Sequence, residues 1–129
     1  MFKPHKWQNQ SEPWELVPAK TGLTLEPGVA MVYAGGALQK ATGATAPTHI
    51  CMEKVSATEE GQMIHAERVR PETEYETELS VASASIAVGA KYTIDANGEK
   101  ITATTEGGVA TVTAFDGTAA GSKVRVRFA

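Results

Sequence analysis

The chain has 129 residues, a formal net charge of −3, 42% apolar residues and only 6% aromatic residues. This length and composition predict one compact domain with a core of small side chains, and the acidic balance argues against a nucleic-acid partner. The single cysteine, Cys51, excludes an intramolecular disulfide. No apolar run approaches the roughly 20 residues of a transmembrane helix, and the first residues lack the apolar segment of a signal peptide. We therefore expect no membrane partner and a protein that begins in the cytoplasm.

The first segment, residues 1–28, holds four prolines, at positions 4, 13, 18 and 27. Because proline fixes φ and lacks an N–H donor, we predict an extended N-terminal arm here rather than a central strand or a helix. The arm carries both tryptophans, Trp7 and Trp14, and each ring would bury on the order of 150–250 Å² if docked. We expect the arm to lie on the domain, on a neighbouring copy or on a partner.

Residues 29–129 are predicted to form a single β domain, because short apolar runs alternate with turn residues throughout. The runs include VAMVYA, THICMEKV, QMIHAERV and TEYETEL, and none shows a sustained period of 3.6. About nine strands in this order predict an all-β fold, a small β-barrel or β-sandwich of short antiparallel strands.

The segment PETEYETEL, residues 71–79, places a glutamate at every second position: Glu72, Glu74, Glu76 and Glu78. On a strand these side chains would line one face, and Tyr75 and Leu79 the other. Carboxylates divide acid and base roles only in unequal environments, and hard cations prefer oxygens from several segments. We therefore expect a solvated, edge-protecting face that can also meet a basic neighbour.

Two hairpins are predicted in the last third of the chain. The first joins residues 91–95 to 99–105 through Asn97-Gly98, which tolerates the positive φ of a tight turn. The second joins residues 108–115 to 122–128, with apolar side chains on one face and basic side chains on the other. The apolar face comprises Val124, Val126 and Phe128, and the basic face comprises Arg125 and Arg127.

Other patterns that could carry chemistry are weaker than their structural alternatives. His49, Cys51 and His65 could meet across a hairpin, but a zinc site needs a fourth ligand or an open water position, and a buried cysteine often acts as a small hydrophobe. The start of a calcium loop is suggested at residues 95–98, but its glycine comes two positions early, so a hairpin turn is preferred. The sequence has no phosphate loop, dinucleotide fingerprint or nucleophile elbow. We expect no metal, no cofactor and no enzymatic activity.

The segment PGVAMVYAGGALQKATGATAPTHICM, residues 27–52, resembles the small head decoration, or capsid cement, proteins of tailed bacteriophages and prophages. The matching positions are Pro27-Gly28, Gly36-Ala37-Leu38, and Ala41-Thr42-Gly43 through Pro47, followed by an apolar strand. Residues 88–128 are similar to the second half of such proteins. The resemblance implies a structural virion protein that binds the outer surface of a phage capsid and stabilises the expanded shell. Its implied partners are the major capsid protein and further copies of itself, as a homotrimer. Its implied location is the virion capsid surface, after assembly in the host cytoplasm.

The resemblance also implies that the arm contacts the shell, so that deleting residues 1–14 would weaken attachment while leaving the β fold intact. The arm residues expected to make this contact are Phe2, Lys3, Lys6, Trp7 and Trp14. Polar contacts between subunits are expected from Glu72, Glu74, Glu76, Glu78, Arg125 and Arg127.

Two other hypotheses remain open at this point. One is a small-ligand or carbohydrate-binding β-barrel, with Trp7, Trp14, Tyr75 or Tyr92 as stacking platforms. The other is an enzyme that uses the group of His49, Cys51 and His65.

Overall fold

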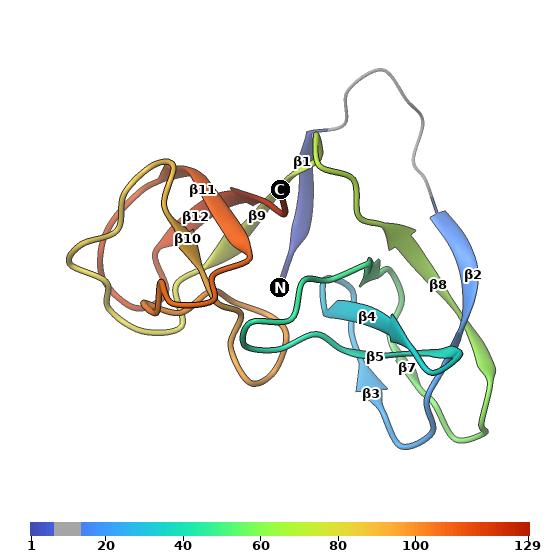
Figure 1. Cartoon of the computed structure of the whole chain (residues 1–129). Coiled ribbons are helices and arrows are strands. Elements are labelled where there is room, and N and C mark those ends of the chain that lie inside the picture. The colour runs from blue at the N-terminus through green and yellow to red at the C-terminus, as the bar shows by residue number, and fades with distance from the viewer. Residues whose placement is uncertain (7–13) are drawn as a thin grey trace.

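The computed structural model describes residues 1–6 and 14–129, and these ranges contain strands but no helix (Figure 1). The all-β prediction is therefore confirmed. Five strands form a closed barrel with the order β2-β5-β4-β6-β8, and five others form an open sheet with the order β1-β9-β12-β11-β10. A helix with the length and apolarity to cross a membrane is absent from the described ranges.

The strands are short, as expected from the spacing of the turn residues. The barrel strands are β2 (Trp14–Ala19), β4 (Ala30–Ala34), β5 (Ala37–Lys40), β6 (His49–Cys51) and β8 (Gln62–Arg68). The open-sheet strands are β1 (Lys3–Lys6), β9 (Glu74–Glu78), β10 (Lys91–Tyr92), β11 (Ala110–Phe115) and β12 (Lys123–Arg127), and a separate pair joins β3 (Thr24–Leu25) to β7 (Val55–Ser56). All of these strand pairs are antiparallel except β2 with β5, which is parallel.

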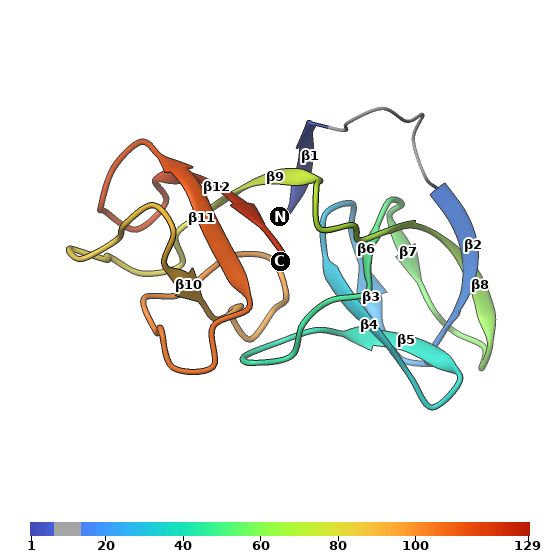
Figure 2. The same cartoon turned by 45° about the horizontal axis from the view of Figure 1, so that its top comes forward.

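The barrel and the open sheet lie side by side, and both views place the two chain ends between them (Figures 1 and 2). One apolar cluster fills the barrel and includes Leu25, Met31, Leu38 and Ile64. The second cluster joins residues of the open sheet, together with Phe2 just before β1, to Ala30, Ala41 and Ile50 from the barrel side. This second core packs the two parts of the molecule against each other.

The side-chain alternation predicted for the second hairpin is confirmed. β11 pairs with β12, and Val124, Val126 and Phe128 are buried while Arg125 and Arg127 lie partly exposed on the opposite face. Apolar residues at every second position face the core because successive side chains of a strand point to opposite faces.

The first predicted hairpin forms only in part. Ile94 and Ile101 make an isolated antiparallel bridge, and Gly98 adopts the positive φ expected of the turn. The turn itself contacts the barrel, because the N–H of Ala30 in β4 donates to the carbonyl oxygen of Gly98 at 2.7 Å. A Cβ at position 98 would lie 3.1 Å from the carbonyl oxygen of Ala30, so glycine also allows this close approach.

The described strands of the N-terminal segment, β1 and β2, are part of the sheets rather than an arm laid on their surface. β1 pairs with β9 at the edge of the open sheet, and β2 pairs with β8 inside the barrel. The expectation that prolines exclude this segment from a central position is wrong for Pro18, which lies within β2. The N–H of Lys20 donates to Leu38 of β5, and backbone groups two residues apart face the same side of a strand. The nitrogen of Pro18 therefore faces β5 rather than β8, and no hydrogen bond to β8 is lost.

Candidate functional site

The acidic ladder lies where the sequence predicted it, on the partly exposed face of β9. Glu74, Glu76 and Glu78 are partly exposed, while Tyr75 and Thr77 between them are buried. Glu72 precedes the strand in an exposed turn. The assignment of the two faces of this strand is therefore confirmed.

Basic side chains of the same molecule lie beside the ladder. Glu76 lies 3.6 Å from the Nε of Arg125 and 3.9 Å from the Nζ of Lys123, because β12 is the neighbour of β9. Glu78 lies 3.6 Å from the Nζ of Lys100. Glu74 accepts a hydrogen bond from the hydroxyl of Thr113 at 2.8 Å. The arrangement is a solvated ion-pair network, and each such exposed pair contributes at most about 1 kcal/mol.

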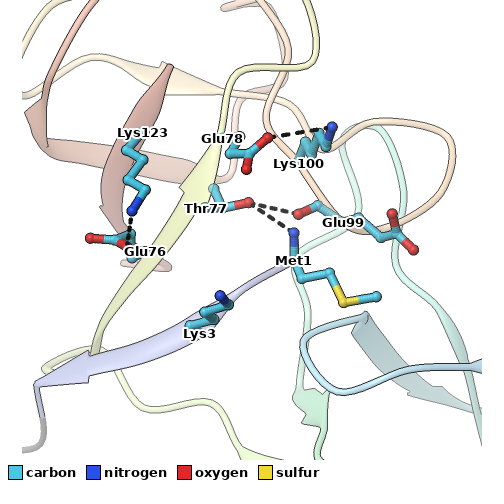
Figure 3. Close-up of a pocket in the computed structure, with 8 residues that line it drawn as sticks. All are labelled: Met1, Lys3, Glu76, Thr77, Glu78, Glu99, Lys100 and Lys123. Carbon is cyan, nitrogen blue, oxygen red and sulfur yellow. Dashed lines mark hydrogen bonds and ion pairs between the residues drawn. The ribbon is translucent and has the colours of Figure 1, made fainter. Parts of the chain in front are cut away.

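A shallow pocket of about 340 Å³ opens beside this ladder, between β1, β9, β12 and the turn near residue 99 (Figure 3). Thr77 lies at its centre: its hydroxyl donates to the carbonyl oxygen of Glu99 at 2.7 Å and accepts from the amino group of Met1 at 3.4 Å. Burial is the main factor that lowers the pKa of the Met1 amino group below its usual value. Carboxylates and amines alternate around this pocket, so it presents no concentrated charge of either sign.

The residues expected to touch a shell fall into different environments. Phe2 is fully buried and its ring packs edge-on against Phe128, with centroids 5.2 Å apart. Its assignment as a surface contact is therefore wrong, because the ring belongs to the second core. Lys3 and Trp14 are exposed. The backbone of Lys6 lies opposite that of Glu74 in the register of β1 and β9. Trp7 lies outside the described residues.

The three potential zinc ligands do not converge. Nε2 of His49 lies 2.6 Å from Glu15, whereas Nδ1 of His65 lies 3.0 Å from Glu53. Cys51 is buried in the barrel core, and its burial raises the pKa of the thiol. Among the residues that the structure describes, no group of three or more His, Cys, Asp or Glu side chains could hold a metal ion.

A polar network connects β2, β6 and β8 at one end of the barrel. The backbone N–H of Tyr33 donates to Oγ1 of Thr48 at 2.8 Å, and that hydroxyl lies 2.9 Å from Nδ1 of His49. The Thr48 proton can then be donated to Nδ1, which leaves Nε2 of His49 as the donor to Glu15. Arg68 completes the network, with Nε and Nη2 at 3.3 and 3.4 Å from the two carboxylate oxygens of Glu15.

The hydrogen bond from His49 is the main cause that lowers the pKa of Glu15. Partial burial of the carboxyl opposes this shift, and Arg68 lowers the pKa further. Glu15 is therefore held as a carboxylate between two donors, which fixes β2 against β6 and β8 at this end of the barrel.

A groove of about 720 Å³ runs beside this network. Its polar wall is formed by Glu15, Thr48, His49 and Arg68. Its apolar lining consists of Leu16, Val17, Pro18, Tyr33, Pro47 and Val69. Apolar walls with a few fixed polar groups are typical of binding sites at the mouths of barrels, so this groove is the strongest candidate site in the described part of the chain.

A second exposed feature lies on the outer face of β2 and β8. Trp14, Leu16 and Met63 are 47%, 55% and 51% exposed. Leu16 pairs with His65 and Pro18 pairs with Met63, so Leu16 and Met63 are diagonal neighbours on one face. We call Trp14, Leu16 and Met63 the outer strip.

Sequence reasoning missed the groove because its residues are far apart in the chain. Glu15, Tyr33, His49 and Arg68 belong to four different strands, and only the barrel register brings them together. The available signal was a polar residue at or next to the end of three apolar runs: Glu15, His49 and Arg68.

Two predicted stacking platforms are also wrong, because Tyr75 and Tyr92 are buried in the second core.

No protein-family model matches this sequence, and no curated protein matches it either.

Proposed function

We propose that the chain is a structural virion protein that binds the outer surface of a phage capsid and stabilises the expanded shell. The outer strip is the observation that carries this proposal. It exposes three large apolar side chains in a protein whose other large apolar residues mostly fill two cores. Contiguous exposed apolar side chains mark surfaces that bind other proteins, and the resemblance of residues 27–52 to capsid decoration proteins names the class of partner.

Repeated binding to a lattice suits a contact surface of this modest size. Each copy needs only a moderate affinity, because neighbouring contacts on a shell act together at high effective concentration. The major capsid protein is the proposed partner, and the virion surface is the proposed location. The resemblance also supports a homotrimer, in which Glu72 and Arg127 are available for contacts between subunits.

Cosedimentation with capsids tests the shell contact directly. The wild-type protein should pellet with expanded capsids of its own phage and remain in the supernatant with compact procapsids. Met63→Asp should abolish pelleting, because it places a charge in the outer strip. Val88→Asp is the matched control, since Val88 is 65% exposed and lies outside the barrel.

Three results would count against parts of the proposal. A wild-type protein that pellets with neither form of capsid contradicts the function itself. Met63→Asp binding that equals the wild type, with an unchanged far-UV circular dichroism spectrum, removes the outer strip as the contact. A light-scattering mass equal to one chain of 13.6 kDa removes the trimer and leaves the shell contact in place.

A further inference from the structure

The barrel has a gap in its backbone pairing beside the groove. β2 and β5 pair at one position, Ala19 with Leu38. β5 begins at Ala37, directly after the Gly35-Gly36 turn that reverses the chain. In the described ranges, therefore, no strand lies beside β2 on this side before Pro18.

The backbone groups exposed in this gap can be identified from the pairing. On the side of β2 where the gap lies, the N–H of Lys20 donates to the carbonyl oxygen of Leu38. The backbone N–H and C=O groups of every second residue in a strand face the same side. The register of β2 with β8 is continuous from Trp14 to Ala19. The N–H and C=O groups of Leu16 and Trp14 therefore face the gap, spaced as the edge of a sheet would present them.

The groove provides room and side-chain contacts next to this edge. Val17 and Tyr33 form part of its apolar lining, and Tyr33 is 46% exposed. Arg68 stands at its polar wall with a side chain that is 61% exposed. Arginine has five N–H donors, and the hydrogen bonds of Arg68 to Glu15 come from Nε and Nη2. His49 also donates to Glu15, so the carboxylate is shared between two partners. The guanidinium of Arg68 therefore keeps N–H donors that Glu15 does not use.

We propose that this groove binds an extended segment of another protein, which adds to the edge of β2 as a further strand. Its backbone pairs with Leu16 and Trp14, an apolar side chain rests on Tyr33 and Val17, and an acidic side chain meets Arg68. Strand addition of this kind takes affinity from the backbone and specificity from alternate side chains. Under the proposed function the segment belongs to the capsid protein, and only this last assignment rests on that function.

An extended peptide fits these features better than a sugar or a small apolar ligand. Main-chain donors and acceptors at two-residue spacing match another strand, whereas a sugar site would use several aromatic faces. In the groove lining, Tyr33 is the sole aromatic residue among the described positions.

A display library of random twelve-residue peptides, selected on the immobilised full chain, tests the inference. The enriched peptides should carry an acidic residue two positions from an apolar residue, because both must point to the groove. Leu16→Pro should weaken their binding at least tenfold, since it removes an N–H from the open edge. Pro18 already occupies an equivalent position with its nitrogen on the same side, so β2 accommodates this change.

Charge reversal provides the second variant and a specific signature. Selection on Arg68→Glu should enrich basic residues where the wild type enriches acidic ones, and Val88→Asp should leave the wild-type preference unchanged. Absence of enriched peptides overturns the inference, as do peptides that bind Leu16→Pro and Arg68→Glu as tightly as the wild type. Binding of the chain to an oligosaccharide array, without enrichment of any peptide, also overturns the inference. A chain that selects peptides but does not bind capsids contradicts only the proposed function.

Discussion

Truncation of Phe2 distinguishes a buried N-terminal segment from a surface arm. Phe2 is fully buried, with 0% solvent exposure, and its ring packs against Phe128 at an interplanar angle of 64°. Replacing a buried phenylalanine with alanine costs about 3–5 kcal/mol, because apolar contact is lost and a cavity remains. We expect Phe2→Ala to lower the free energy of unfolding by about 4 kcal/mol.

This loss is large enough to be measured in two ways. With an unfolding entropy of about 2.1 cal/mol/K per residue, it lowers the melting temperature of a 129-residue chain by about 15 °C. Denaturant unfolding followed by far-UV circular dichroism gives the free energy itself. Phe2→Leu keeps most of the apolar volume and should lose about 0.5–1.5 kcal/mol with the aromatic pair.

Lys3 supplies the matched control, because it is the next residue along the chain and is exposed. Lys3→Ala should change the free energy of unfolding by no more than about 0.5 kcal/mol. A loss below about 1 kcal/mol for Phe2→Ala would refute the reasoning and return Phe2 to the surface. For the same reason, deletion of residues 1–14 should destabilise the fold, since it removes Phe2 and β1 together.

Three further predictions follow from charged and titratable groups. The folded-state pKa of Glu15 is depressed, so its contribution to stability is present above the usual value near 4.5 and is lost as the pH falls through the folded pKa. Glu15→Gln should therefore reduce the drop in melting temperature between neutral pH and pH 3, and an acid limb identical to that of the wild type would exclude this role. The double change Glu74→Gln and Glu76→Gln should leave the circular dichroism spectrum intact and reduce the salt dependence of stability; loss of the fold would show that β9 has the opposite face inward. Native Cys51 should react with a disulfide reagent far more slowly than the unfolded chain, because burial raises its pKa; equal rates would place the thiol at the surface.

Local alternation accounts for what the sequence predicted well. The faces of β9 and β12 follow from period-two patterns within strands of five residues, such as Tyr75 against Glu76 or Val126 against Arg127. Such patterns identify a strand and its buried face, because each side chain must point to one side or the other. They do not identify the partner strand, and the ion pair of Glu76 with Arg125 depends on that partner.

The N-terminal segment shows why local rules are insufficient. Proline at position 18 argues against a central strand, but the cost of proline depends on which neighbour its nitrogen faces. In β2 it faces the side where pairing with β5 is limited to one position. Phe2 likewise has no local pattern that predicts burial, and it is buried because β1 brings it to a core built from residues 30 to 128.

The sequence by itself determined the all-β class, the buried faces of β9 and β12 and the acidic ladder, because each depends on neighbours within one strand. Only the tertiary structure decided the closed barrel, the burial of Phe2 and the groove with its open edge. These features depend on strand order and register, which join residues as distant as Glu15, His49 and Arg68. Contacts of this kind are set by the packing of the whole chain, and no short stretch of sequence carries them.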